Sequence, residues 1–426
     1  MKEKYTISKM SQLSIPLDIP NVHVLKTRID KNDAFVITVE GTKQSTICQH
    51  CGRKITQFHG HDKWIRLRHL PILGRPVYIR LRPKRYKCPH CDGGPTTTQQ
   101  LEWYTPHSPH TKAYDQHLLL QLVNSTVEDV SQKEKVGYDA VEGAIKRHIT
   151  ETVDWSAFKE LGVVGIDEIA LTKGRSNYAA IITSQQAKGQ VAILAVLPDR
   201  KKETVRQFLD SIPRHLRATI KSVCTDMWDG YITAVQEFEQ AHDEVSLVVI
   251  VDRFHVAKNY RDCVDTLRKS ERRRLQKELS ETEYESIKGV LWPCRKNNCD
   301  LTTAERQQLR ALFAYSPALK AAYTLREELT AIFDLPLNRQ EALRRLDKWQ
   351  AKVRRQSVTC FDTFLKTLKN HLSLIANYFI NRLSSGFVEG LNNKIKTIKR
   401  RCYGISRIDH LFQRIYLDLE GYRLFA

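Results

Sequence analysis

Long apolar runs are missing from this sequence of 426 residues. No window approaches the roughly 20 consecutive apolar residues that a membrane-spanning helix needs. The opening residues Met1-Lys2-Glu3-Lys4 also lack the apolar segment of a secretory signal. These absences exclude an integral membrane protein and predict a cytosolic protein without a membrane partner.

Acidic residues are scarce relative to basic ones. The sequence has 48 Asp and Glu against 68 Lys and Arg, which gives a formal net charge of +20. An excess of this size favours a polyanionic partner, and we expect a nucleic acid; the plainer alternative is a soluble protein that is merely basic. The length allows about two to four domains.

Four of the ten cysteines stand in two close pairs, Cys48-Gln49-His50-Cys51 and Cys88-Pro89-His90-Cys91. In a large cytosolic chain such pairs indicate metal ligands rather than disulfides. Two C-x2-C turns complete the tetrahedral thiolate shell of a structural Zn²⁺, whereas the alternative is chance spacing or a redox pair. The other cysteines are scattered: Cys224, Cys263, Cys294, Cys299, Cys360 and Cys402.

Residues 52–87, between the two pairs, can hold a hairpin. Apolar and polar side chains alternate there as on an antiparallel strand, with Val77, Ile79 and Leu81 on one side and Tyr78, Arg80 and Arg82 on the other. Residues 101–110 are rich in Pro, His and Thr, so we expect a linker there.

Three helices are expected next, over residues 113–123, 127–134 and 139–149. Lys135-Val136-Gly137-Tyr138 supplies the short glycine turn of a helix-turn-helix between the last two. The third helix is expected to carry Lys146, Arg147 and His148 on its outer side. DNA binding is the favoured interpretation, and a plain packing module is the alternative.

The pattern then changes to strands, expected at 161–168, 178–184, 190–197, 220–225 and 245–251, with helices at 201–212 and 228–240. The last strand is almost wholly aliphatic, as expected for a strand buried on both faces. This order resembles the ribonuclease H-like fold, in which the first and fourth strands lie side by side. Asp167 and Asp226 end those two strands and should therefore be neighbours at a solvent-facing edge, while Asp252 and His255 follow the fifth strand.

Acidic residues at such an edge suit metal chemistry on phosphodiesters. Two Mg²⁺ (or Mn²⁺) ions about 3.5–4 Å apart activate the nucleophile and stabilise the leaving oxyanion, and hard cations take oxygen ligands. Two aspartates need a third acid, and Glu389 is the candidate, in a basic helix expected at 384–396. The alternative for each aspartate alone is a helix N-cap or turn, and for Glu389 a solvated ion pair.

A long helical interruption separates Asp252 from Glu389. Helices are expected at 264–289, 303–315, 318–333, 339–355 and 361–379. The first of them is amphipathic and strongly basic.

These motifs resemble a DDE transposase of the bacterial ISL-type insertion-sequence family. The resemblance covers residues 48–416 and implies that Asp167, Asp226 and Glu389 are the catalytic metal ligands. It further implies that Asp252 and His255 support the site. Lys396 lies two helical turns beyond Glu389, where the resemblance implies that it holds the phosphate near the cut; the alternative is simple surface solvation. The matching pieces are the paired C-x2-C finger, the helix-turn-helix, Gly-Ile-Asp167-Glu, Thr-Asp226-Met-Trp, Val-Asp252-Arg-Phe-His255-Val and Val-Glu389-Gly-Leu-Asn-Asn-Lys-Ile-Lys.

The expected fold is multidomain α+β. A zinc-binding domain (1–105) and a helix-turn-helix domain (106–155) precede a ribonuclease H-like mixed α/β catalytic core (156–262). An all-α insertion (263–380) interrupts this core, and C-terminal helices with Glu389 (381–426) complete it.

The resemblance implies an enzyme that binds terminal inverted repeats in double-stranded DNA, cleaves the ends and transfers the 3′-OH ends to target DNA. We expect a homodimer in the DNA complex, in the bacterial cytoplasm and associated with the nucleoid. One rival is a domesticated DNA-binding regulator without cleavage activity, against which the three acids argue. Another is a junction-type nuclease, which has no use for the N-terminal finger.

Overall fold

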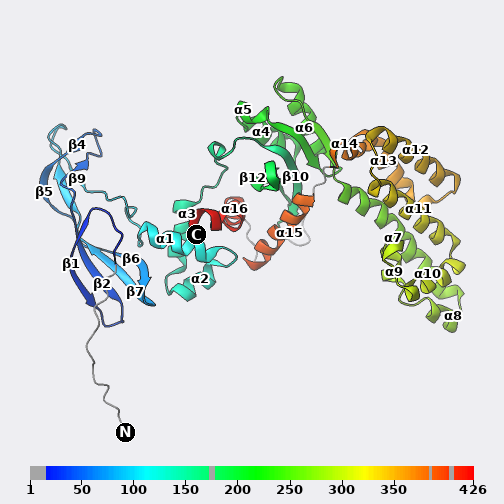
Figure 1. Cartoon of the computed structure of the whole chain (residues 1–426), viewed down its shortest axis with the longest axis horizontal. Coiled ribbons are helices and arrows are strands. Elements are labelled where there is room, and N and C mark those ends of the chain that lie inside the picture. The colour runs from blue at the N-terminus through cyan, green and yellow to red at the C-terminus, as the bar shows by residue number, and fades with distance from the viewer. Residues whose placement is uncertain (1–15, 172–177, 383–385, 403–406) are drawn as a thin grey trace, which may run out of the picture. The chain divides into compact units, whose positions relative to one another are not determined.

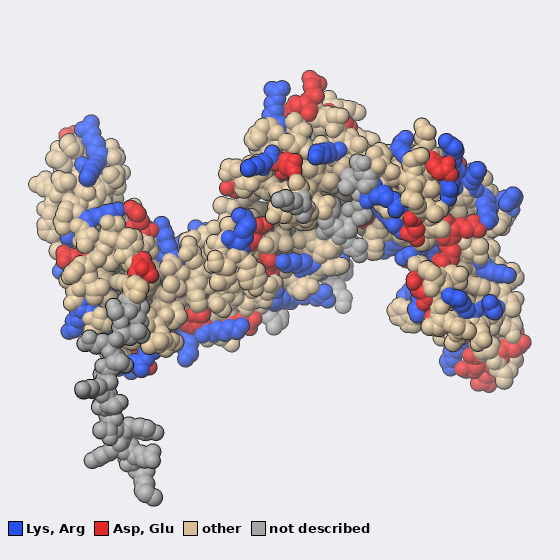
Figure 2. Space-filling model, in the orientation of Figure 1, with Lys and Arg blue, Asp and Glu red and all other residues tan. Residues whose placement is uncertain are grey.

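The computed structural model (Figure 1) describes residues 16–171, 178–382, 386–402 and 407–426, and leaves aside the side chains of residues 188, 291, 381 and 386–389. The chain forms two compact units, one of residues 1–149 with 420–426 and the other of residues 150–419. Lysine and arginine side chains are distributed over the visible surface of both units (Figure 2). No helix of the described segments is long and apolar enough to cross a membrane.

A four-stranded sheet with strand order β1-β2-β7-β6 organises the first unit. Strand β7 is antiparallel to β6 and parallel to β2. The predicted alternation along β7 is confirmed, because Val77, Ile79 and Leu81 are buried in the core of this unit. The strands are β1 (Val22–Ile29), β2 (Phe35–Gly41), β6 (Ile65–Ile72) and β7 (Arg75–Leu81).

Two small sheets carry the cysteine pairs. One pairs β3 (Thr46–Ile47) with β4 (Lys54–Ile55), and the other joins β5 (Gln57–His61), β8 (Lys84–Lys87) and β9 (Thr96–Thr98). Cys48 directly follows β3, and Cys88 directly follows β8. Each pair is therefore held at the end of a strand.

The linker expected at 101–110 is wrong. Leu101, Trp103 and Tyr104 are buried in the core beneath the four-stranded sheet. The backbone of Arg68 in β6 also donates to the Pro109 carbonyl at 2.9 Å and accepts from the Thr111 N–H at 2.9 Å. Burial of three large apolar side chains outweighs the turn-forming composition of this segment.

The three expected helices are confirmed as α1 (Lys112–Leu122), α2 (Val127–Glu134) and α3 (Tyr138–His148). Thr111 and Thr126 cap the first two, each accepting from a backbone N–H with its side-chain oxygen. Helix α2 ends at Lys135, which is left-handed with φ 53°, and α3 follows Gly137. The predicted short turn thus joins α2 to α3.

The outward placement of Arg147 and His148 is wrong. Arg147 donates to both carboxylate oxygens of the buried Asp115 in α1, at 2.8 and 2.7 Å. His148 and His110 lie at hydrogen-bond distance from the same carboxylate, 3.2 and 2.8 Å away. Burial opposes the charge of Asp115, but these hydrogen bonds outweigh it and hold its pKa well below the usual range. Of the three basic residues, only Lys146 is exposed.

We expect Asp115→Ala to lower the free energy of unfolding of the first unit by about 3–5 kcal/mol, because it leaves buried cationic donors without an acceptor. Lys146→Ala is the matched control, since Lys146 makes only an exposed pair with Glu142 at 2.9 Å and should change stability by less than about 1 kcal/mol. Chemical denaturation measures both. Equal losses in the two variants would contradict a structural role for the Asp115 cluster.

A five-stranded sheet with strand order β12-β11-β10-β13-β14 organises the second unit (Figure 1). Strand β10 is antiparallel to β11 and parallel to β13, which is parallel to β14. The expected strands, and the neighbouring position of the first and fourth, are confirmed. They are β10 (Gly162–Ala170), β11 (Tyr178–Gln185), β12 (Val191–Leu197), β13 (Ile220–Thr225) and β14 (Val248–Val251).

Helices cover both faces of this sheet. Alternation along β11 sends Ala180 and Ile182 toward α4 (Lys202–Ser211) and α6 (Asp229–Ala241). It sends Ala179 and Ile181 toward α15 (Gly386–Arg401) and α16 (Ile408–Phe425). The short α5 (Arg214–Arg217) lies between α4 and β13 in the sequence.

The helical interruption is confirmed, but its first and last helices differ from expectation. Two helices, α7 (Arg253–Glu278) and α8 (Glu281–Ser286), occupy the stretch where one helix was expected at 264–289, because a capping box between Ser280 and Glu283 starts a new helix. Helix α9 (Leu291–Arg295) follows them. The helix expected at 361–379 ends at Asn377, whose side chain donates to the Val249 carbonyl at 2.8 Å. The others are α10 (Thr303–Tyr315), α11 (Pro317–Asp334), α12 (Arg339–Arg355), α13 (Asp362–Ala376) and α14 (Tyr378–Asn381).

The five-segment division of the chain stays a prediction. Its expected boundary between residues 262 and 263 falls inside α7, which continues without a break from the end of β14.

Candidate functional site

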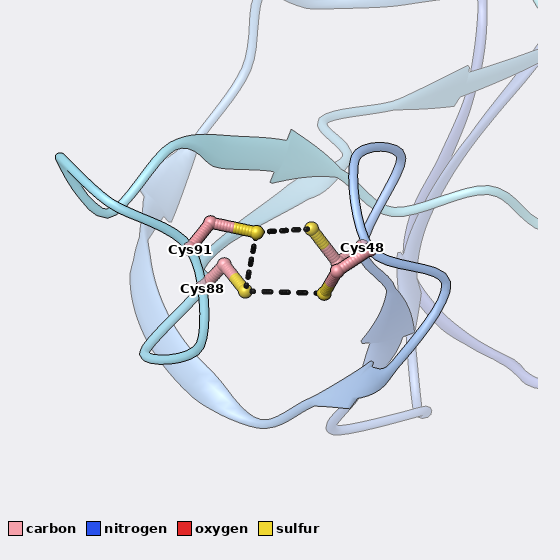
Figure 3. Close-up of side chains that lie close together, drawn as sticks. Cys48, Cys88 and Cys91 are labelled. Carbon is pink, nitrogen blue, oxygen red and sulfur yellow. Dashed lines mark hydrogen bonds between the residues drawn. The ribbon is translucent and has the colours of Figure 1, made fainter.

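The four paired cysteines meet in the first unit (Figure 3). Their Sγ atoms all lie within 4.8 Å of one another. Neighbouring sulfurs are 3.6 Å apart for Cys88 and Cys91, 3.7 Å for Cys51 and Cys88, and 4.0 Å for Cys48 and Cys91. A tetrahedron with Zn–S bonds of about 2.3 Å has edges of about 3.8 Å, so this cluster fits one zinc ion.

Backbone N–H groups lie at hydrogen-bond distance from two of the four sulfurs. The N–H groups of His50 and His90 each lie 3.4 Å from the first sulfur of their pair. The backbone N–H groups of Cys51 and His50 lower the pKa of the Cys48 thiol to about 6, whereas hydrogen bonds with Cys51 and Cys88 raise the pKa of Cys91 to about 12. The thiolate form is favoured at Cys48 and disfavoured at Cys91, and a bound cation would favour it at Cys91 as well.

Cys88→Ser should release the metal, because a tetrahedral site loses one of its four thiolates. Metal analysis of the purified chain should find about one zinc in the wild type and close to none in the variant. The melting transition of the second unit should not change. Cys299→Ser is the control, since this exposed cysteine lies outside the cluster. A wild-type protein without zinc would refute the assignment.

Three aspartates form a row at one edge of the second unit's sheet. In the register of the parallel strands, Ile166 lies opposite Thr225, and Thr225 lies opposite Val251. The next residue along the chain is an aspartate in each case: Asp167, Asp226 and Asp252. Asp226 and Asp252 directly follow β13 and β14, but β10 continues past Asp167 to Ala170, so the expectation that Asp167 ends its strand is wrong. Because the carboxyl ends of neighbouring parallel strands share an edge, the structure brings together the two aspartates predicted as ligands and the one predicted to support them.

Each of these carboxylates accepts a backbone hydrogen bond. Asp167 accepts from the Glu168 N–H at 2.7 Å, Asp226 from the Trp228 N–H at 2.9 Å, and Asp252 from the Phe254 N–H at 2.9 Å. Asp252 is buried and caps the N-terminus of α7. Local turn and capping bonds therefore fix the direction of all three, and they leave further lone pairs for another ligand.

Electrostatics disfavours full ionisation of this row. Burial, reinforced by the charges of Asp226 and Asp252, raises the pKa of Asp167 to about 6, although the Glu168 N–H opposes the shift. Burial and the charge of Glu168 also raise the pKa of Asp226. Such carboxylates gain most from a nearby cation. Among the described residues, the cysteine cluster is nevertheless the only group of three or more His, Cys, Asp or Glu side chains whose ligand atoms all lie within 4.8 Å of one another. The aspartates alone therefore do not form a complete metal shell.

The remaining predicted residues lie on two helices, His255 on α7 and Glu389 and Lys396 on α15. His255 is half-buried in the first turn of α7, with Nε2 3.8 Å from Asp252 Oδ2. Glu389 belongs to α15, but its side chain lies outside the described part of the structure. Lys396 is exposed on the same helix. An open cavity of about 370 Å³ adjoins Asp226 and His255, and Lys258 lines it as well.

Glu168, the acid that follows Asp167, is paired with an arginine and so does not compete with the aspartates as a metal ligand. Arg200 donates to its carboxylate at 2.9 Å. The Arg200 guanidinium also lies 4.6 Å from the ring centre of Tyr178 and 4.5 Å from that of Trp228. Arg200 therefore neutralises Glu168 beside the aspartate row, a contact that the sequence analysis missed because the two residues are far apart in the chain.

Asn392 is a site residue that the sequence analysis also missed. It is 4% exposed, on the apolar stripe by which Leu391, Ile395 and Ile398 of α15 pack against the sheet. Its Nδ2 donates to Asp167 Oδ2, and its Oδ1 has no partner among the described residues. A buried amide at a position suited to leucine is costly. The available signal was an amide three residues after Glu389, at helical spacing.

Asn392→Leu should leave the fold intact, because leucine extends the apolar stripe of α15. It should weaken Mn²⁺ binding by about 10- to 100-fold, as expected when a residue that orients a ligand is lost. Thermal shifts in a Mn²⁺ titration measure this. Asn393→Ala, at the exposed neighbouring position, should bind Mn²⁺ normally, and unchanged affinity in Asn392→Leu would contradict the orienting role.

Comparison with known proteins adds independent findings. Residues 164–415 match the profile of a family described as "Transposase", and residues 44–91 match one described as "zinc-finger of transposase IS204/IS1001/IS1096/IS1165". The chain is 28% identical over 398 residues to the transposase for insertion sequence element IS1001 of Bordetella parapertussis, covering 92% of this chain and 93% of that protein. It is 24% identical over 423 residues to the transposase for insertion sequence element IS1557 of Mycobacterium tuberculosis, covering 92% and 91%. Among solved structures, the "Drosophila P element transposase strand transfer complex" is similar with a TM-score of 0.40 and 12% identity, covering 73% of this chain and 92% of that chain.

Proposed function

The chain belongs to the transposase family that matches residues 164–415, as its motifs indicated, and from this premise we propose that it cuts and joins DNA at the ends of its own insertion sequence. It binds the terminal inverted repeats, cleaves there and transfers the freed 3′-OH ends to target DNA. The observation that carries the proposal is the row of Asp167, Asp226 and Asp252, which the register of three neighbouring parallel strands places side by side.

The catalytic core in this proposal is ribonuclease H-like. Its support is the strand order β12-β11-β10-β13-β14, with only β11 running antiparallel to both of its neighbours. In this order the first and fourth strands of the core are adjacent, so two acids distant in sequence share one edge. The helices α7–α14 form the insertion between β14 and α15.

Asp167, Asp226 and Glu389 would hold the catalytic Mg²⁺ or Mn²⁺. When bound, two such ions supply a deprotonated nucleophile and neutralise the leaving oxyanion. The fit of the aspartates rests on their raised pKa values and open edge. The hydrogen bond from Asn392 to Asp167 supports a position of α15 over the same edge, with Glu389 one turn before Asn392 on that helix.

Other residues orient the site and the DNA. Asp252 fixes the start of α7 and keeps His255 beside the acids. Lys396, exposed and two turns beyond Glu389, holds the phosphate near the cut. Helices α2 and α3 act as a helix-turn-helix that reads the inverted repeats, and a homodimer brings two ends together.

Glu389→Gln tests the proposal most sharply at the level of activity. The change keeps shape but removes a charge that holds metal, so strand cleavage should fall by about 100-fold or more. A gel shift on the same preparation should show undiminished binding of the DNA ends.

Glu203→Gln is the control for this experiment, because Glu203 is exposed on α4 and should cut normally. Near-normal cleavage by Glu389→Gln would mean that the third ligand lies elsewhere. A wild-type protein that binds the ends but never cuts with Mg²⁺ would instead favour a DNA-binding regulator.

A further inference from the structure

One face of the four-stranded sheet in the first unit is basic. The opposite face is the apolar core, so alternation along the strands directs a separate set of side chains outward. Strand β1 lies at the edge of this sheet, and its residues beyond Val22 are exposed. The cations at the surface of this side, which we call the basic face, are Lys26, Arg28, Arg66 and Arg80. Arg68 belongs to the same side by register, but it is buried.

The register places like charges together on this face. Arg66 lies directly opposite Arg80 across β6 and β7. Thr38 of β2 lies opposite Arg80 on one side and Lys26 on the other. The cations Arg66, Arg80 and Lys26 therefore fall on one row across the sheet. Like charges directly opposite each other destabilise a sheet. An anion bound across the row would relieve this repulsion and so stabilise the three cations.

Aromatic rings hold two of these arginines in place. The Arg66 guanidinium lies 3.6 Å from the ring centre of Tyr78, and that of Arg80 lies 4.3 Å from the ring centre of Trp64. Cation–π contacts of this kind attract the guanidinium without consuming its hydrogen-bond donors. The donors therefore stay oriented, and they match the geometry of phosphate oxygens.

Little carboxylate neutralises the face among the residues that the structure describes. Asp30 accepts from Arg66 at 3.2 Å. Glu40 points outward from β2, but it pairs with Lys84 at 3.4 Å. One paired carboxylate, Asp30, for four cations leaves the basic face positively charged, which selects a polyanion rather than an apolar partner.

The buried Arg68 connects this side of the sheet to the helices expected to read DNA. The Arg68 guanidinium lies 5.2 Å from the Tyr78 ring and 5.4 Å from the ring of Tyr114 in α1. Helix α3 itself offers little charge, since Arg147 is bound to Asp115 and only Lys146 is exposed among its basic residues. Backbone contacts supply much of the affinity for DNA, so they must come largely from another part of this unit.

We propose that the basic face binds the phosphate backbone of double-stranded DNA next to the sequence that α2 and α3 read. The inference rests on the proposed function for the identity of the DNA, whereas the charge and geometry of the face stand without it. Phosphate contacts fix orientation and carry no sequence information. The face is therefore a positioning surface that sets affinity and salt dependence, while specificity belongs to the helices.

The test is a salt titration of duplex binding by the full chain carrying Arg66→Gln and Arg80→Gln. Each arginine that contacts a phosphate contributes about 0.9 to the slope of log K against log salt. The double variant should therefore lose about 2 from this slope, equally on the inverted repeat and on unrelated duplex. Lys43→Gln is the control, because Lys43 is already paired with Glu102 at 2.7 Å and should leave the slope unchanged.

Arg80→Lys refines the result. Lysine keeps the charge but loses the planar guanidinium over Trp64, so affinity should fall while most of the slope remains. An unchanged slope in the double variant, with zinc content intact, would overturn the proposal. A loss confined to single-stranded DNA of equal length would overturn it as well.

A different result would refute the proposed function. A wild-type chain that binds its own ends no better than unrelated duplex would refute end recognition. The variants would still report whether the face binds phosphate.

Discussion

The repulsion among three carboxylates, one in β10 and two directly after β13 and β14, is the constraint on which this protein depends. Parallel pairing puts Asp167, Asp226 and Asp252 on one edge, where burial and mutual charge raise the pKa of Asp167 to about 6. Folding alone gains nothing from this arrangement. Nearby contacts limit its cost: Arg200 neutralises Glu168 next to the row, and Asp252 accepts a hydrogen bond from the Phe254 N–H at the N-terminus of α7. The remaining charge is what a divalent cation would satisfy.

Helix α15 reaches the same edge although it is distant in sequence. Asn392 of this helix is 225 residues after Asp167 and donates a hydrogen bond to it. Helix α15 packs its apolar stripe against the sheet, and Asn392 interrupts that stripe to reach Asp167. The helices α7–α14 share a core of aliphatic and aromatic residues with β13, β14 and α6, among them Cys224, Ile250 and Ile232, so they pack directly on this side of the sheet. Helix α7, which is capped by Asp252 and is 26 residues long, joins the edge to the helices that follow.

Much of this could be predicted from the sequence where the signal is local. Apolar runs located the five strands of the second unit, alternation located β7, and C-x2-C spacing located the cysteine cluster. Predictions failed where a distant partner decides the outcome. Arg147 and His148 turn inward because Asp115 lies in another helix, and residues 101–110 are buried because Leu101, Trp103 and Tyr104 find a sheet to pack on. Asn392 looked like part of a polar helix, since nothing local shows that its neighbour in space is Asp167. The basic face of β6 and β7 required the register between strands.

The central claim is that Asp167 and Asp226, with Glu389, hold divalent metal. Anomalous diffraction from crystals of the full chain soaked in Mn²⁺ tests it most directly, because manganese is located without reference to activity. The account predicts anomalous density within coordination distance of both Asp167 and Asp226, with the Glu389 carboxylate on the same ion or on a second ion about 3.5–4 Å away. Manganese absent from this edge, or bound there by other residues without Asp167 and Asp226, would contradict it.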